Sequence, residues 1–132
     1  MINLDTNVLL RHILQDDAAQ GEVARKALAA AARAGELVFV SNMVLVEFLW
    51  TLHRVYKVPK GPRVEVMRAL VSDPRFVLEK DGEVRRAFAL WSEGKADFAD
   101  YLIGLVGESH GARETLTFDQ GLRGAAGFRV LE

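Results

Sequence analysis

Acidic residues follow short apolar runs near both ends of the chain. Ile2-Asn3-Leu4 leads into Asp5, and Thr115-Leu116-Thr117-Phe118 leads into Asp119. In open α/β sheets, ligands bind just outside the carboxyl ends of the strands. If both runs are strands, we expect these two carboxylates to share one acidic pocket. In the alternative interpretation, Asp5 only caps a helix and Asp119 only belongs to a turn.

Three more acids lie where chemistry is plausible. Glu47 interrupts an apolar stretch, 43–52, which predicts a helix buried in a core or an interface. An unpaired buried carboxylate is very costly, so we expect Glu47 either to face a cation or to pair with an arginine. Asp97 and Asp100 are three residues apart at an expected helix start, on one face of that helix. Capping of the helix and a favourable interaction with its dipole are the simpler explanations for this pair.

Four carboxylates in one pocket need a compensating positive charge. Two carboxylates about 5 Å apart repel by roughly 3 kcal/mol at an effective dielectric near 20, so six such pairs approach about 20 kcal/mol. A domain is stable by only about 5–15 kcal/mol, so the pocket must hold protons, basic side chains or a divalent cation. Oxygen ligands beside Thr6, Asn7 and Thr117 suit Mg²⁺ or Mn²⁺, which activate water for phosphodiester hydrolysis.

The elements that position these acids alternate between strand and helix. The sequence predicts strands at the Asp5 run and at 37–40, 76–78, 115–118 and 128–131. It predicts helices over about 8–14, from the Asp16-Asp17 cap to 33, from Ser41 or Asn42 to 57, over 63–72, 81–92 and from Asp97 to 109, with a connector at 59–62. This alternation indicates a parallel sheet with helices on both faces. We therefore expect a single α/β domain over residues 1–132.

Composition restricts the chemistry further. The 132 residues include no cysteine, which excludes disulfides and thiolate metal sites. The sequence predicts neither a membrane span nor a secretory signal, so we expect a cytoplasmic protein. A net charge of −1 argues against broad, nonspecific coating of nucleic acid. A nuclease with a local acidic pocket remains compatible with that charge.

Four short motifs together resemble a known family. They are Asp5-Thr6-Asn7, the stretch 41–47 ending in Glu47, Ala96-Asp97-Phe98-Ala99-Asp100, and Thr117-Phe118-Asp119. Their order and spacing are similar to those of the PIN-domain family, and within it to the VapC-type ribonuclease toxins of toxin–antitoxin pairs. The resemblance covers essentially the whole chain.

The resemblance implies a three-layer α/β/α sandwich around a mainly parallel sheet, and an endoribonuclease that depends on Mg²⁺ or Mn²⁺. It also implies an RNA substrate, a homodimer and inhibition by a cognate antitoxin. The family's acidic quartet matches Asp5, Glu47, Asp100 and Asp119, which would be both catalytic residues and metal ligands. Its small polar helpers match Thr6, Asn7 and Thr117. Either Asp97 or Asp100 matches the third acid; we favour Asp100 because it directly precedes the apolar helical run, which makes Asp97 accessory.

Other functions remain open at this stage. A PIN-fold nuclease of RNA processing, without an antitoxin, has the same residues. A non-catalytic binding module would use the acidic pocket to dock a partner's arginine, although docking alone does not need every metal ligand. A phosphotransfer receiver domain also gathers acids at strand ends, but this chain lacks the adjacent acidic pair and the strand-end lysine. The apolar helix around Glu47, with Trp50 and Val55-Tyr56 as surplus hydrophobes, independently predicts a dimer.

Overall fold

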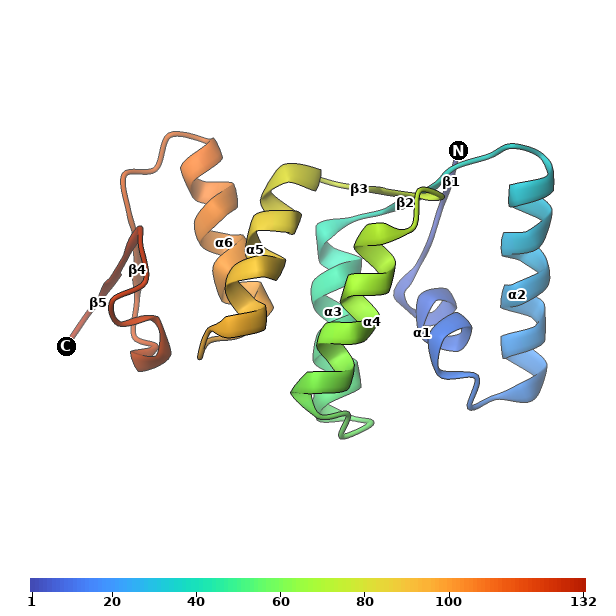
Figure 1. The fold of residues 1–132 in the computed structure, drawn as a ribbon, viewed down its shortest axis with the longest axis horizontal. Helices are drawn as coiled ribbons and strands as arrows, with labels where there is room; N and C mark the ends of the chain where they lie inside the picture. The colour runs from blue at the N-terminus through green and yellow to red at the C-terminus, as the bar shows by residue number, and fades with distance from the viewer. The chain divides into compact units, whose positions relative to one another are not determined.

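Short strands and helices alternate along the whole chain in the computed structural model, which describes residues 1–132 (Figure 1). The strands are β1 (Ile2–Asn3), β2 (Val38–Val40), β3 (Phe76–Leu78), β4 (Thr115–Thr117) and β5 (Phe128–Val130). The helices are α1 (Thr6–Leu14), α2 (Ala18–Arg33), α3 (Asn42–Arg54), α4 (Lys60–Ser72), α5 (Asp81–Glu93) and α6 (Phe98–Ser109), with a 3₁₀ turn η1 (Gln120–Leu122).

All strand pairings are parallel, as predicted. One sheet has the order β1-β2-β3, with Ile2 opposite Val38 and Val38 opposite Phe76. A second sheet pairs β4 with β5. The chain forms two compact units, Met1–Glu79 around the first sheet and Lys80–Glu132 around the second. Mixed α/β structure with parallel strands agrees with the predicted sandwich.

The first unit is built on the central strand β2. Its Val38 and Val40 side chains are buried, as a short apolar run in a covered sheet requires. Helices α1 and α3 pack on each other, and α3 and α4 lie side by side (Figure 1). The core residues of these helices include Leu9, Leu45, Phe48, Leu52 and Met67.

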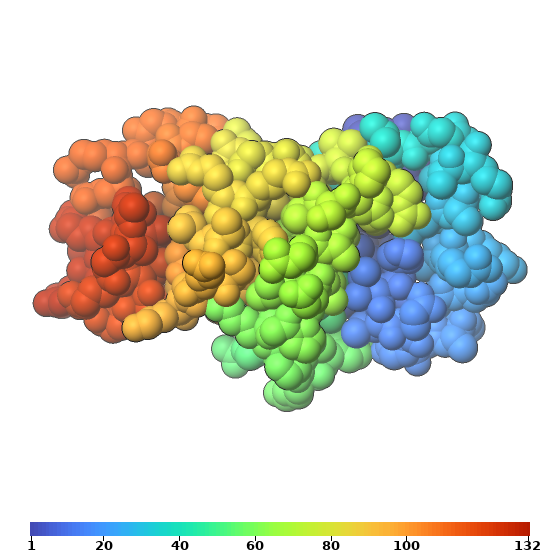
Figure 2. Space-filling view, viewed as in Figure 1, coloured from blue at the N-terminus to red at the C-terminus, as the bar shows by residue number.

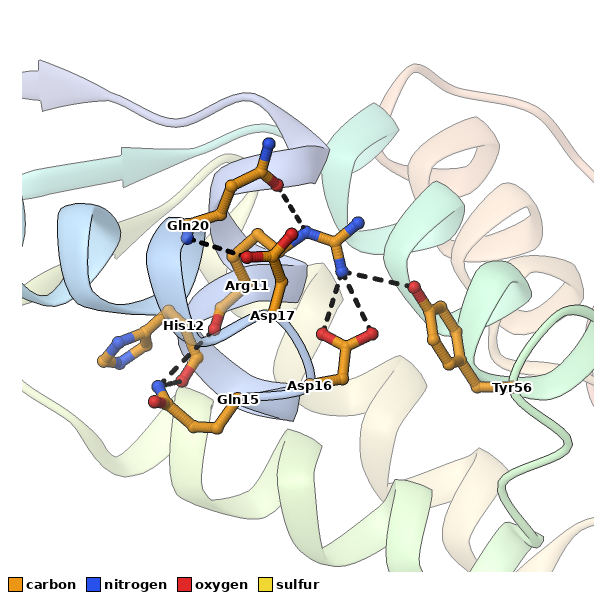
Figure 3. Close-up of polar contacts among 7 residues, drawn as sticks. All are labelled: Arg11, His12, Gln15, Asp16, Asp17, Gln20 and Tyr56. Carbon is orange, nitrogen blue, oxygen red and sulfur yellow. Dashed lines mark hydrogen bonds and ion pairs between the residues drawn. The ribbon is translucent and has the colours of Figure 1, made fainter.

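Arg11 ties four segments of the first unit together (Figure 3). Its Nη1 donates to Asp16 Oδ1 (2.8 Å), in the turn before α2, and to the hydroxyl of Tyr56 (3.3 Å), which follows α3. Its Nε donates to Gln20 Oε1 (2.8 Å) on α2. These bonds fix the end of α1, the helix that starts immediately after Asp5.

The second unit packs α5 against α6 (Figure 1). Trp91 of α5 is 1% exposed and meets Phe98 edge-to-face, with ring centroids 5.9 Å apart. Tyr101 of α6 meets Phe128 of β5 in the same way at 6.4 Å. Figure 2 shows a hollow between the orange and red segments of this unit, where a cavity of about 640 Å³ is lined by Gly104 and other residues of α5, α6 and the strands.

Three predicted boundaries are wrong. Helix α4 begins at Lys60, because Pro62 lies in its first turn, where the missing N–H has no intrahelical partner to lose. Helix α3 ends at Arg54, and Lys57 beyond it has a left-handed backbone with φ of 56°. Asp81, which the sequence predicts as the cap of the helix 81–92, is instead the first residue of α5, and Lys80 takes the cap position. None of the helices has the length and apolar character needed to span a membrane.

Candidate functional site

Asp5 stands at the carboxyl end of β1 and caps α1. The N–H of Leu4 donates to the carbonyl of Phe39 (3.2 Å), so the end of β1 is held against β2. Asp5 Oδ1 accepts the N–H of Thr6 (2.7 Å), which confirms the capping interpretation as local structure. Asp5 and Asn7 are exposed, whereas Thr6 is buried. The cap engages Oδ1 alone, so Oδ2 of Asp5 remains available to a ligand.

Glu47 is exposed, and the prediction that it is buried is wrong. It makes no salt bridge, so the alternative of a buried ion pair with an arginine is also excluded. Its helical neighbours Met43 and Trp50 are 80% and 58% exposed. The helix has a buried face and an exposed face, which the continuous apolar run in the sequence does not distinguish. Leu45 and its core neighbours point inward, whereas Met43, Glu47 and Trp50 lie on the exposed face.

Glu79 is an acid at the same edge of the first sheet that sequence reasoning missed. It directly follows β3, and its N–H donates to the carbonyl of Val40 (3.1 Å). Its Oε1 accepts the N–H of Asn42 (2.8 Å), at the start of the helix that carries Glu47. The signal was present, because Phe76-Val77-Leu78 ends in an acid just as the Asp5 run does.

Asp97 and Asp100 occupy the first turn of α6, as predicted. Asp97 is the N-cap, and its N–H donates to Asp100 Oδ2 (3.1 Å) in the manner of a capping box. Asp97 is exposed and Asp100 is half-buried. Both carboxylates are therefore held by the start of one helix.

Asp119 follows β4 and is held by its own turn. Its N–H donates to Thr117 Oγ1 (3.0 Å), and its Oδ1 accepts the N–H of Gly121 (2.8 Å). The turn interpretation of Asp119 is thus correct locally. Thr117, predicted as a polar helper, orients the backbone of this acid.

Asp100 and Asp119 lie close enough to influence each other's ionisation. Burial is the main factor that raises the pKa of Asp100, although the N–H of Asp97 opposes it. The negative charges of Asp119 and Asp97, and a hydrogen bond with Asp119, raise the pKa of Asp100 further. The negative charges of Asp119 and Asp97 therefore disfavour ionisation of Asp100. A divalent cation among these oxygens would relieve that repulsion.

The predicted site residues fall into two sets. The second unit brings together Asp97, Asp100 and Asp119 with Thr117. The first unit carries Asp5, Thr6, Asn7 and Glu47. No group of three or more carboxylate or imidazole side chains in the structure is arranged to hold a metal ion by itself. The meeting of all four acids in one pocket stays a prediction.

Two comparisons with known proteins bear on this site. The sequence profile of the PIN domain matches residues 2–127. The chain is also 28% identical over 115 residues to the VapC ribonuclease of Aquifex aeolicus (strain VF5), a match that covers 87% of this chain and 84% of that protein.

Proposed function

The chain belongs to the PIN domain family, and from this premise we propose that it is an endoribonuclease that uses Mg²⁺ or Mn²⁺. The observation that carries the proposal is the Asp100–Asp119 pair, whose environment raises the pKa of Asp100. Such a pair is an incomplete cation site made only of oxygen, the donor that Mg²⁺ and Mn²⁺ prefer. Asp5 and Glu47 would supply the remaining carboxylates of the quartet.

Each residue has a role that its surroundings permit. Asp5 Oδ2, Glu47, Asp100 and Asp119 would bind the cation, which when bound supplies an activated water for attack on phosphorus. Asp97 holds Asp100 through its backbone N–H and is accessory. The small polar helpers orient the ligands or the substrate: Thr6, Asn7 and Thr117.

The relative's name, VapC ribonuclease, supports the toxin of a toxin–antitoxin pair over a nuclease of RNA processing. The proposal therefore includes an RNA substrate, a cognate antitoxin that blocks the site, and a homodimer. Residues 1–132 would act as one nuclease domain, with ligands contributed from both ends of the chain.

The decisive measurement is cleavage of single-stranded RNA with Mg²⁺ or Mn²⁺ and with EDTA. Asp5→Asn, Glu47→Gln and Asp100→Asn should each reduce the rate by about 100-fold or more. The reason is that a catalytic metal lowers the activation barrier by several kcal/mol, and each variant removes one of its ligands. Asp81→Asn is the matched control, since Asp81 is exposed and pairs only with Arg85 on α5. It should cleave at the wild-type rate.

Undiminished cleavage in EDTA would refute the metal-dependent mechanism. A wild-type protein that cleaves no RNA under any of these conditions, yet binds an arginine-containing peptide at the acids, would favour the binding module.

A further inference from the structure

Two turns of the second unit meet beside the acids, and Gly121 lies where they approach each other. They are the turn 119–121, which follows β4, and the loop 94–97, which leads into α6. A Cβ atom at Gly121 would lie 3.1 Å from Asp119 Oδ1, 3.4 Å from the carbonyl oxygen of Lys95 and 3.6 Å from the nitrogen of Ala96. A side chain at Gly121 would therefore fill the space against the loop 94–97 and press on the Asp119 carboxylate, which is the tightest of the three contacts.

Tyr101 holds the same loop from the helix side. Its ring is buried, and its hydroxyl accepts the N–H of Ala96 (3.4 Å), one residue before Asp97. Gly94 makes room for this hydroxyl, because a Cβ atom there would collide with it and would lie 2.7 Å from the carbonyl oxygen of Leu90. A phenylalanine ring would fill the same apolar space, so packing alone does not explain the hydroxyl.

Tyr101 and Gly121 both lie against the loop 94–97, and that loop carries the cap of α6. We infer that Tyr101 and Gly121, with Gly94 making room for the Tyr101 hydroxyl, are positioning residues that hold Asp100 and Asp119, and the Asp97 cap beside them, in place to contribute to a divalent-cation site. The inference rests on the proposed metal site. Mg²⁺ demands near-ideal octahedral geometry, so small displacements of a ligand matter.

Tyr101→Phe and Gly121→Ala test the inference in the full-length protein. Loss of an outer contact to a metal ligand typically weakens metal affinity by about 10–100-fold, and we expect that range for both variants. Mn²⁺ binding is measured directly, from the electron paramagnetic resonance signal of free Mn²⁺. In metal-free Tyr101→Phe, the amide of Ala96 should also exchange its hydrogen faster than in the wild type.

Two glycines within α6, Gly104 and Gly107, provide matched controls. A Cβ atom at Gly107 would make only an ordinary 3.6 Å contact with Ala112, whereas one at Gly104 would collide with the ring of Phe128. Gly107→Ala should raise the melting temperature slightly, because alanine favours a helix interior over glycine, and should leave Mn²⁺ affinity unchanged; Gly104→Ala should lower the melting temperature. Both should keep the wild-type dissociation constant within about twofold, as expected for sites that act independently.

The possible results separate the inference from the proposed function. Wild-type Mn²⁺ affinity in both Tyr101→Phe and Gly121→Ala overturns the positioning role while the metal site stands. Loss of affinity in Gly104→Ala in proportion to its loss of stability also overturns it, because affinity would then follow general stability. A wild-type protein that does not bind Mn²⁺ overturns the metal site itself and the inference with it.

Discussion

Asp100 experiences two opposing influences on its charge. The N–H of Asp97 stabilises the ionised carboxylate, as does its place at the start of a helix. Burial acts more strongly in the opposite direction, and the charges of Asp119 and Asp97 add to it, so the pKa of Asp100 is raised. In the metal-free protein this residue therefore lowers the stability of the fold when it is ionised.

This raised pKa predicts a pH-dependent benefit from neutralising Asp100. The native state binds more protons than the unfolded state between the unfolded pKa, near 3.8, and the raised native pKa. The free energy of unfolding therefore falls as pH rises through that window, and the full penalty persists above it. Asp100→Asn removes the penalty and should raise the metal-free melting temperature at pH 7 by about 1–4 °C, a small gain because solvent screens this half-exposed carboxylate.

Thermal unfolding of both proteins at pH 7 and at pH 3.5, with EDTA present, measures the effect. The gain should be much smaller at pH 3.5, below the unfolded pKa, where Asp100 is mostly protonated in both states. A variant that is less stable than the wild type at pH 7 would show that the bond to Asp97 outweighs burial and repulsion.

At the scale of helices and strands, the sequence predicted what depends on local pattern. Asp17, Ser41 and Asp97 cap their helices as expected, because capping needs only a short polar side chain beside an apolar run. The strand-end position of Asp5 and Asp119 followed from the same kind of local signal. The exposure of Glu47 did not, because a continuous apolar run does not reveal which of its faces is covered.

The contacts around the acids in the second unit depend on tertiary structure. Gly94, Tyr101 and Gly121 lie in three different segments, and nothing in their spacing indicates that a hydroxyl and a bare Cα approach the same loop. Glu79, by contrast, can be identified from the sequence, because it directly follows the strand β3 as Asp5 and Asp119 follow theirs. Close approach between turns is the part of this site that a local sequence pattern does not encode.

Helix α3 presents a large apolar side chain to solvent. Trp50 is 58% exposed beside Met43, at 80%, so deep burial within the monomer does not explain this tryptophan. In the proposed homodimer, a second copy of the chain would cover this tryptophan. We expect Trp50 to lie at its centre, since aromatic residues concentrate binding energy in such interfaces.

Trp50→Glu should convert a wild-type dimer into a monomer at tens of micromolar protein. That range follows from interfaces of standard size, whose affinities are about micromolar or tighter. Light scattering during gel filtration gives the mass of each species. Ile103→Glu, which alters another exposed apolar residue, on α6, should leave the dimer intact. A wild-type protein that is already monomeric in this range contradicts the interface.

The whole molecule raises the question of whether its two units are stable separately. Lys80–Glu132 is shorter than the roughly 60 residues at which an isolated domain is already marginal. A unit of that size has little reason to be stable alone, so we expect residues 1–132 to unfold as a single cooperative domain.

The two tryptophans make this prediction measurable, because Trp50 lies in Met1–Glu79 and Trp91 in Lys80–Glu132. In Trp50→Phe, fluorescence reports only on the second unit, whereas in Trp91→Phe it reports only on the first. Far-UV circular dichroism of each variant reports on all helices at once.

If the domain unfolds as a whole, the fluorescence and circular dichroism curves in urea should coincide within each variant, which is the test of two-state behaviour. Comparison within a variant matters because Trp91 is fully buried, so its replacement should lower stability by itself. A fluorescence transition of Trp91 at lower urea than the circular dichroism transition of the same protein would show that Lys80–Glu132 unfolds separately. The acids at the two ends of the chain would then belong to units that do not depend on each other for stability.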